Sequence, residues 1–216
     1  MLEKMSTFFE NRLDNYDWHM LNEIESANEF YPYTAEQLPK EPACSILDLG
    51  CGTGLELEFY FSCNPTARVT GIDLAEKMLA ALAVKFPDKD MQLICGSYFE
   101  EPLGEDRFDA AVSVESLHHF TMEEKIPLYT RLCAALKDGG YFILTDYFAL
   151  SNEEEQLHRA TLQELKAEQG ICDEEFYHYD TPLTVAHETK ALLAAGFTAV
   201  EVLKNWGATY LLKAIK

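Results

Sequence analysis

The spacing of hydrophobic positions changes repeatedly along the chain from residue 44 onward. Short apolar or β-branched runs, typical of buried strands, cover residues 44–49, 68–73, 91–95, 108–114 and 141–147. Between them, apolar residues recur every three or four positions at 55–63, 75–86 and roughly 123–137, as on one face of a helix. Strands that alternate with helices in this way are typical of βαβ units on a parallel sheet.

The last third of the chain departs from this alternation. Residues 153–170 predict an additional helix, and residues 184–197 predict a final helix that ends at Gly196. Two closing strands, at about 197–204 and 207–214, lie so close in sequence that only an antiparallel hairpin fits between them. We therefore predict an α/β fold with a doubly wound, mostly parallel seven-stranded sheet and an antiparallel last strand.

Two local features refine the predicted organisation. The helix at 123–137 is expected to end at Lys137, with Gly139 or Gly140 in the left-handed position after it. The N-terminal 43 residues begin with helical spacing and then loosen at residues 31–43, whose prolines indicate a linker. We expect residues 1–43 to form a helical lid and linker, and residues 44–216 one main domain with a helical insert at about 148–183.

Composition narrows the class of protein. With 216 residues and 48% apolar content, the chain is long enough for one well-buried core. It lacks an N-terminal apolar segment typical of a secretory signal, and no run approaches the roughly 18 apolar residues of a membrane span. Six cysteines form no CxxC pair, which argues against a disulfide scaffold. These features predict a cytoplasmic protein without a membrane partner.

The net charge of −20 argues against a nucleic-acid partner, because such proteins normally cluster Lys and Arg against the phosphate backbone. The charge is also uneven. Residues 1–43 carry nine acids against three bases, and residues 151–180 carry nine against two. These acids either solubilise the two segments or favour cationic substrates over anionic ones.

The sequence ILDLGCGTGLE, residues 46–56, places a glycine turn between the first strand and the next helix. Glycines let a backbone approach a ligand closely. The dinucleotide fingerprint G-x-G-x-x-G would require a glycine at position 55, where this chain has Leu55. Asp48 before the turn and Glu56 after it also disfavour a pyrophosphate, so a ligand with a positive centre fits better.

Asp73 ends the second strand, where an acidic side chain can accept both hydroxyls of a ribose. The alternative is a helix cap ahead of Ala75. A ribose together with a positive centre suggests S-adenosylmethionine as the cofactor.

Residues 44–147 resemble class I S-adenosylmethionine-dependent methyltransferases in the motifs ILDLGCGTG, VTGIDLAEKML and LKDGGYFILTDYF. The resemblance implies a Rossmann-like fold with helical lid segments. It also implies that Asp73 holds the ribose, that Leu74 and Met78 flank the adenine, and that the methionine part lies beside the turn residues Gly50, Cys51, Gly52 and Gly54.

Other cofactor contacts follow from the same resemblance. Tyr16, in an N-terminal helix that resembles a lid, would reach the cofactor carboxylate, and Glu115 would meet its ammonium group. A buried lid aromatic is the alternative for Tyr16. Where the family often has an acidic residue against the adenine amine, this chain has Ser97 and Tyr98, so backbone amides and Tyr98 are expected to contact the adenine.

The candidate catalytic residues are His118 and His119, which follow the fourth strand. Adjacent residues of one regular element cannot point the same way, so at most one is expected to face the active site. No further ligand at a suitable spacing is apparent, so no metal site is predicted. The substrate is expected between the N-terminal helix and the insert, at four aromatic residues that are alternatively lid core: Trp18, Tyr147, Tyr177 and His178.

Methyl transfer mainly requires alignment of the acceptor with the methyl group, which explains why no catalytic triad is evident. The expected function is N- or O-methylation of a small molecule. The alternatives are a non-catalytic module that binds S-adenosylmethionine and, less favoured by Leu55 and Asp48, an NAD-dependent oxidoreductase. The sequence is compatible with a homodimer but does not require one.

Overall fold

The structure is a computed structural model that describes residues 1–173 and 175–216. A single sheet with strand order β3-β2-β1-β4-β5-β7-β6 runs through it, and only β7 is antiparallel to its neighbours. This sheet confirms the predicted fold. Its strands are β1 (Ser45–Leu49), β2 (Arg68–Asp73), β3 (Asp90–Cys95), β4 (Phe108–Val114), β5 (Leu136–Tyr147), β6 (Ala199–Trp206) and β7 (Thr209–Ile215).

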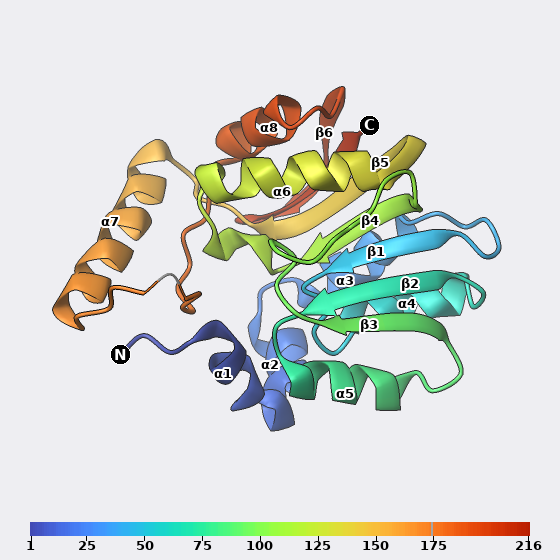
Figure 1. Cartoon of the computed structure of the whole chain (residues 1–216), viewed down its shortest axis with the longest axis horizontal. Coiled ribbons are helices and arrows are strands. Elements are labelled where there is room, and N and C mark those ends of the chain that lie inside the picture. Colours follow the sequence, from blue (N-terminus) through green and yellow to red (C-terminus); the bar gives the residue numbers. More distant parts are fainter. Residues whose placement is uncertain (174) are drawn as a thin grey trace.

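Helices cover both faces of the sheet (Figure 1). They are α1 (Met5–Glu10), α2 (Leu13–Glu23), α3 (Ala27–Glu36), α4 (Leu55–Cys63), α5 (Glu76–Lys85), α6 (Met122–Ala135), α7 (Asn152–Glu168) and α8 (Val185–Ala194), with a short 3₁₀ helix, η1, at Leu117–His119. The α6 and α8 helices lie over one face, and α3 and α4 lie behind the other. Within the described residues, no helix has the length and apolarity needed to span a membrane.

Alternating side chains of the strands build one hydrophobic core on each face. In β1, Leu47 and Leu49 belong to the core under α6 and α8, whereas Ile46 belongs to the core under α3, α4 and α5. Neighbouring strands follow the same alternation, with Phe142 on the first side and Ile143 on the second. Burial on both faces explains why these strands are continuous apolar runs in the sequence.

The predicted linker at residues 31–43 is wrong in its first half. Residues 31–36 continue α3, with Pro32 inside the helix. The reason is tertiary packing, because Phe30, Tyr31 and Ala35 are buried and Thr34 is hydrogen-bonded to Thr145 of β5 at 2.6 Å. Burial of this face offsets the backbone hydrogen bond that a proline removes.

The predicted end of the helix before β5 is also wrong. The α6 helix ends at Ala135, and β5 begins at once, with Leu136 paired to Phe108. Gly139, at φ +75°, lies within β5 beside a register shift, so its left-handed conformation serves a strand irregularity and not a helix end. Lys137 forms an ion pair with Asp109 at 2.7 Å.

The carboxyl ends of the parallel strands meet at one edge of the sheet. The glycine turn follows β1, Asp73 ends β2, Glu115 follows β4, and Asp146 lies near the end of β5. Two segments far apart in sequence cover this edge, since Met5 N–H donates to the Phe176 carbonyl and His178 N–H donates to the Glu3 carbonyl, each at 2.9 Å. The N-terminal helices and the insert thus enclose the place where parallel α/β sheets bind ligands.

Candidate functional site

The three glycines of the turn are required for different structural reasons. A Cβ on Gly50 would lie 2.0 Å from Ser116 Oγ, and one on Gly54 would lie 2.5 Å from Leu82 Cδ1. Those two glycines therefore allow close packing within the protein. Gly52, at φ +48°, faces open space, since the nearest atom to its missing Cβ is the Tyr16 hydroxyl at 3.9 Å. Gly52 is the glycine that leaves room for a ligand.

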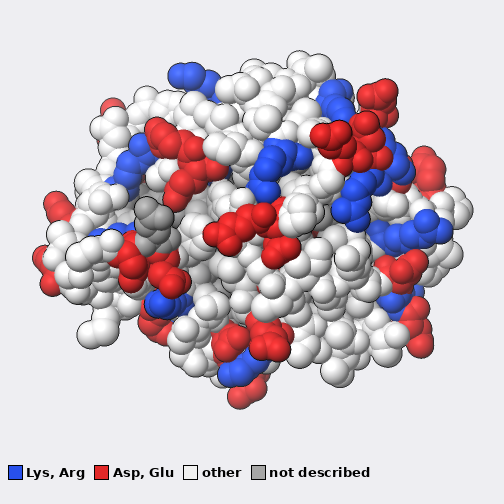
Figure 2. All heavy atoms as spheres, in the orientation of Figure 1, with Lys and Arg blue, Asp and Glu red and all other residues white. Residues whose placement is uncertain are grey.

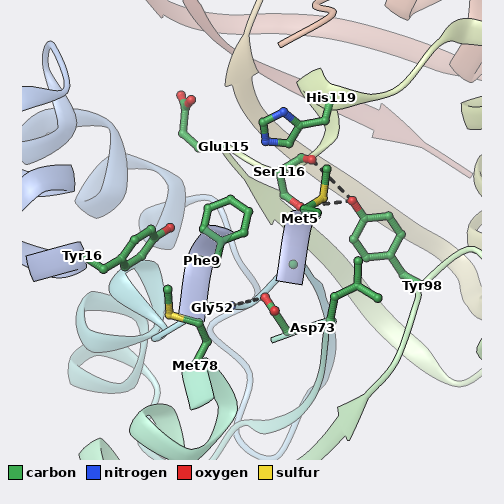
Figure 3. Close-up of a pocket in the computed structure, with 12 residues that line it drawn as sticks. Met5, Phe9, Tyr16, Gly52, Asp73, Met78, Tyr98, Glu115, Ser116 and His119 are labelled. Atoms are coloured by element: carbon green, nitrogen blue, oxygen red, sulfur yellow. Dashed lines mark hydrogen bonds between the residues drawn. The ribbon is translucent and has the colours of Figure 1, made fainter. Parts of the chain in front are cut away.

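The Asp73 carboxylate is held by two backbone amides. Gly52 N–H donates to Oδ2 at 2.8 Å (Figure 3). Ala75 N–H donates to Oδ1, also at 2.8 Å. A carboxylate offers about four acceptor positions, so two remain for the hydroxyls of a ligand. Burial raises the pKa of Asp73, while the two amides act in the opposite direction. The contact with Ala75 also fits the helix-cap alternative, and the two roles are compatible.

A narrow inner cavity lies over Asp73 and Gly52. Leu74, Met78 and Tyr98 form part of its wall, and Met5 and Phe9 of α1 project into it from the opposite side (Figure 3). Its volume is about 40 Å³, which holds only a few water molecules. A nucleoside-sized ligand therefore requires α1 to shift.

The α2 helix is fastened to the glycine turn through Asp17. Thr53 Oγ1 donates to Asp17 Oδ1 at 2.5 Å, and Lys85 of α5 binds Asp17 Oδ2 at 2.7 Å. The adjacent Tyr16 reaches the inner cavity, where burial raises the pKa of its hydroxyl. Asp17 thus positions Tyr16 over the turn.

Two acidic side chains are buried beneath the turn. Asp48 and Glu56 are neighbours, and Asp48 Oδ2 and Glu56 Oε1 have no hydrogen-bond partner among the described residues. Burial and the neighbouring Glu56 carboxyl raise the pKa of Asp48. Burial also raises the pKa of Glu56, although the neighbouring Asp48 carboxyl lowers it in part. A shared proton between the two groups is the arrangement that these shifts favour.

A larger outer cavity of about 910 Å³ adjoins the inner one. The two share four wall residues, namely Phe9, Tyr16, Glu115 and His119. The outer cavity is also bordered by His118, Tyr147, His178 and Asp180. Both adjacent histidines therefore face the site, because η1 is a single irregular turn and its side chains do not alternate. The prediction that at most one faces it is wrong.

His118 lies between two carboxylates. Its Nδ1 is 2.5 Å from Asp146 Oδ1, and its Nε2 is 3.5 Å from Asp180 Oδ1. Burial disfavours the imidazolium, but these carboxylates outweigh it and raise the pKa of His118. Asp146 is itself fixed by N–H groups of Leu117 at 2.8 Å and Tyr147 at 2.9 Å. The Asp146–His118 pair is thus rigidly oriented.

His119 and Glu115 complete the wall between the cavities. His119 Nδ1 lies 3.2 Å from both Asp180 Oδ1 and the Tyr179 carbonyl, and burial lowers the pKa of His119. Burial, followed by repulsion from Asp146, raises the pKa of Glu115 to about 8. The Glu115 backbone has φ +49°, an uncommon left-handed conformation for a residue with a Cβ.

Several sequence-predicted site residues lie outside both cavity walls. Trp18 is 61% exposed, and the exposed Tyr177 hydroxyl contacts Asp173 at 3.2 Å. Ser97 Oγ accepts from Phe99 N–H at 3.2 Å. Cys51 and Gly54 in the turn, and Asp48 before it, are buried.

The site residues that the sequence analysis missed include Met5, Phe9, Asp17, Asp146 and Asp180. Asp146 carried a usable signal, since it stands near the carboxyl end of a predicted parallel strand. Asp180 carried none, because an irregular insert brings it to the site.

Residues 46–140 match a family model described as a methyltransferase domain. A (+)-O-methylkolavelool synthase of Herpetosiphon aurantiacus is 31% identical over 64% of this chain and 51% of that protein. A tRNA (carboxymethyluridine(34)-5-O)-methyltransferase of Arabidopsis thaliana is 29% identical over 55% of this chain and 28% of that protein. The chain spans about half or less of the length of the curated relatives it matches first.

The fold recurs in a solved S-adenosylmethionine-dependent methyltransferase of Mesorhizobium loti. The two structures superpose with a TM-score of 0.62 over 86% of this chain and 96% of that one, at 23% sequence identity. At this level of sequence identity, the similarity shows a shared fold only.

The observed residues fit S-adenosylmethionine chemically. Asp73 retains free acceptor positions, the space over Gly52 is open, and Leu74 and Met78 offer an apolar wall. Glu115 lies at the junction of the two cavities, where a positive centre would favour the ionised form of its carboxyl group.

The Asp48–Glu56 pair predicts a pH-dependent gain in stability for Asp48→Asn. A carboxyl whose pKa is raised by folding stabilises the protein fully below its unfolded pKa, and this contribution is lost as pH rises through the folded pKa. The asparagine variant avoids that loss. Its melting temperature should exceed that of the wild type at pH 8, by about 2–4 °C for each kcal/mol gained, and by less at pH 4.

Calorimetric melting across this pH range, with the exposed Asp88→Asn as control, measures the difference. A gain that is equal at every pH, or a loss that grows with pH, contradicts the raised pKa of Asp48.

Proposed function

Because residues 46–140 match a methyltransferase domain and the fold recurs in S-adenosylmethionine-dependent methyltransferases, we propose that the chain is a class I S-adenosylmethionine-dependent methyltransferase that transfers a methyl group to a small acceptor bound in the outer cavity. The observation that carries this proposal is the continuity of the two cavities. The inner cavity contains the Asp73 carboxylate and its hydrogen bond with Gly52 N–H. The outer cavity adjoins it at the shared residues Glu115 and His119. A cofactor in the first therefore faces an acceptor in the second.

We assign the cofactor contacts residue by residue. Asp73 would accept the ribose hydroxyls, and Leu74 and Met78 would flank the adenine, with Tyr98 at the far wall. Glu115 and Tyr16 would contact the amino-acid end. Bound there, S-adenosylmethionine supplies an electrophilic methyl group on a sulfonium. The α1 and α2 helices would exclude water from it.

The acceptor is inferred from the size and charge of the outer cavity. Its volume of about 910 Å³ suits a small molecule. Among the described residues of its wall, Arg12 is the one Lys or Arg side chain, and it is bound to Glu3 at 3.0 Å. Acidic side chains line the same wall at Asp14, Glu25, Glu115 and Asp180. This wall favours a neutral or amine-bearing acceptor that is methylated on nitrogen or oxygen.

On the face of the molecule that Figure 2 draws, the acids do not form one continuous patch. Figure 2 shows them in several separate groups, with basic side chains among them. Selection by charge would therefore arise in the cavity wall.

Catalysis would depend mainly on alignment, because methyl transfer from a sulfonium needs a base only for a protonated nucleophile. Tyr147 and His178, the latter stacked on Phe8 with ring centroids 3.4 Å apart, would hold the acceptor. His118 and His119 are the groups able to act on an acceptor proton, since both border the cavity.

The cofactor assignment predicts that S-adenosylhomocysteine raises the melting temperature and that NAD does not, because a ligand that binds only the native state stabilises it. Asp73→Ala should weaken S-adenosylhomocysteine binding by roughly 1–3 kcal/mol, the range for hydrogen bonds to a charged group. Gly52→Val should weaken it further, since its side chain fills the open space. Calorimetric titration measures both, with Asp90→Asn at the far edge of the sheet as control.

Stabilisation by NAD alone would refute the cofactor assignment. Unchanged affinity in both variants, each folded by its own melting transition, would refute the site.

The acceptor assignment predicts S-adenosylhomocysteine release with small amines or phenols, and little with carboxylic acids or RNA. The preference should weaken as salt screens the cavity carboxylates. A panel of the four classes, assayed at low and high salt, tests this. Preferred methylation of RNA would instead support an activity like that named for the tRNA-modifying relative, and cofactor binding without release in any class would support the non-catalytic alternative.

A further inference from the structure

Two histidines and one carboxylate converge at the edge of the outer cavity. Asp180 Oδ1 lies 3.5 Å from His118 Nε2 and 3.2 Å from His119 Nδ1, and the three ligand atoms all lie within 4.8 Å of one another. In a tetrahedral site with metal–nitrogen bonds of 2.0–2.1 Å, neighbouring ligand atoms are about 3.3 Å apart. The two measured separations match that edge length.

From this geometry we propose that His118, His119 and Asp180 form a binding site for a divalent transition-metal ion. Two imidazoles and one carboxylate suit Zn²⁺, Fe²⁺ or Co²⁺ better than Mg²⁺ or Ca²⁺, which prefer oxygen ligands alone. All three residues border the outer cavity, so the remaining coordination positions of the ion would face the acceptor space.

The surroundings of His118 have the form found around metal-binding histidines. Such a histidine usually donates its other ring nitrogen to a carboxylate, which fixes the tautomer and the direction of the ring. Here His118 Nδ1 contacts Asp146 Oδ1 at 2.5 Å, which leaves Nε2 directed to Asp180. Asp146 is in turn fixed by two backbone N–H groups.

Asp180 is also held in place by the backbone. The N–H of the next residue, Thr181, donates to the His118 carbonyl at 2.8 Å, which fastens the insert directly to η1. His119 Nδ1 lies equally close to the Tyr179 carbonyl at 3.2 Å. A proton on that nitrogen is thus shared between two oxygens, and a metal ion would take its place beside both.

The charge of the cluster favours a cation. Three carboxyl groups surround the His118 ring, with Glu115 Oε2 3.9 Å from Nδ1 in addition to Asp146 and Asp180. Glu115, Asp146 and both histidines are largely buried, so a positive charge at this point compensates acids that water reaches poorly.

The role of the ion rests on the proposed function. A metal ion beside the acceptor would orient its oxygen or nitrogen and, for a hydroxyl, favour loss of the proton. This role fits a site in which both histidines contact Asp180, because an ion bound to them would take over their action on the acceptor proton.

The test is metal binding by the tag-free full chain after chelator treatment. Zn²⁺ is titrated in competition with a chromophoric chelator, and Co²⁺ is added separately to record its visible absorption. We expect one ion per chain. The visible absorption of bound Co²⁺ should be that of an ion with a low coordination number. His119→Ala and Asp180→Asn should weaken Zn²⁺ binding at least tenfold, and Asp146→Asn by about 10–100-fold.

Matched controls are Asp173→Asn in the same insert and His158→Ala in α7, which should bind Zn²⁺ as the wild type does. Near-ultraviolet circular dichroism and S-adenosylhomocysteine binding report whether each variant is folded. No stoichiometric binding by the wild type, or equal binding by the folded His119 and Asp180 variants, would overturn the proposal and leave an ion-pair cluster. Because binding is measured without an acceptor, this outcome is independent of whether methyl transfer occurs.

Discussion

The hydrogen bond from Gly52 N–H to Asp73 Oδ2 joins the turn after β1 to the end of β2, and the rest of the site is arranged around it. It directs the Asp73 carboxylate toward the open space over Gly52, where no Cβ intrudes. The next residue, Thr53, binds Asp17 and thereby fastens the α2 helix above the same space. One short turn therefore borders the inner cavity, orients the Asp73 carboxylate and holds the α2 helix above it.

Buried carboxyl groups dominate the electrostatics on both sides of this turn. Beneath it, Asp48 and Glu56 share an environment in which burial raises both pKa values. Beyond it, Glu115, Asp146 and Asp180 surround His118. Such a concentration of acids is costly unless positive charge compensates it. A sulfonium cofactor, a cationic acceptor and a metal ion are the compensating charges that our proposals supply.

The sequence predicted the sheet well because its strands are buried on both faces and appear as continuous apolar runs, and because the Gly207 hairpin leaves only one pairing for β6 and β7. It failed at Pro32 and Gly139. The burial of Tyr31 keeps Pro32 within a helix, and the pairing of Leu136 with Phe108 places Gly139 within a strand. These tertiary contacts outweigh the local preferences of proline and glycine.

Site residues at the ends of strands, such as Asp73 and Glu115, could be predicted from the sequence, because the topology brings these strand ends together. Asp180 could not, since it reaches the site through an insert fixed by backbone contacts to η1 and to the N-terminal segment. Trp18 shows the converse, because an aromatic residue in a lid helix can point to solvent as easily as inward.

The central claim is that the cofactor lies between the glycine turn and the N-terminal helices. A crystal structure of the chain with S-adenosylhomocysteine tests it most directly. The account predicts the ribose hydroxyls on the Asp73 carboxylate, the amino-acid end beside Glu115 and Tyr16, and Met5 and Phe9 displaced from the inner cavity. Electron density for the ligand elsewhere, or with Asp73 still bonded only to Gly52 and Ala75, would contradict it.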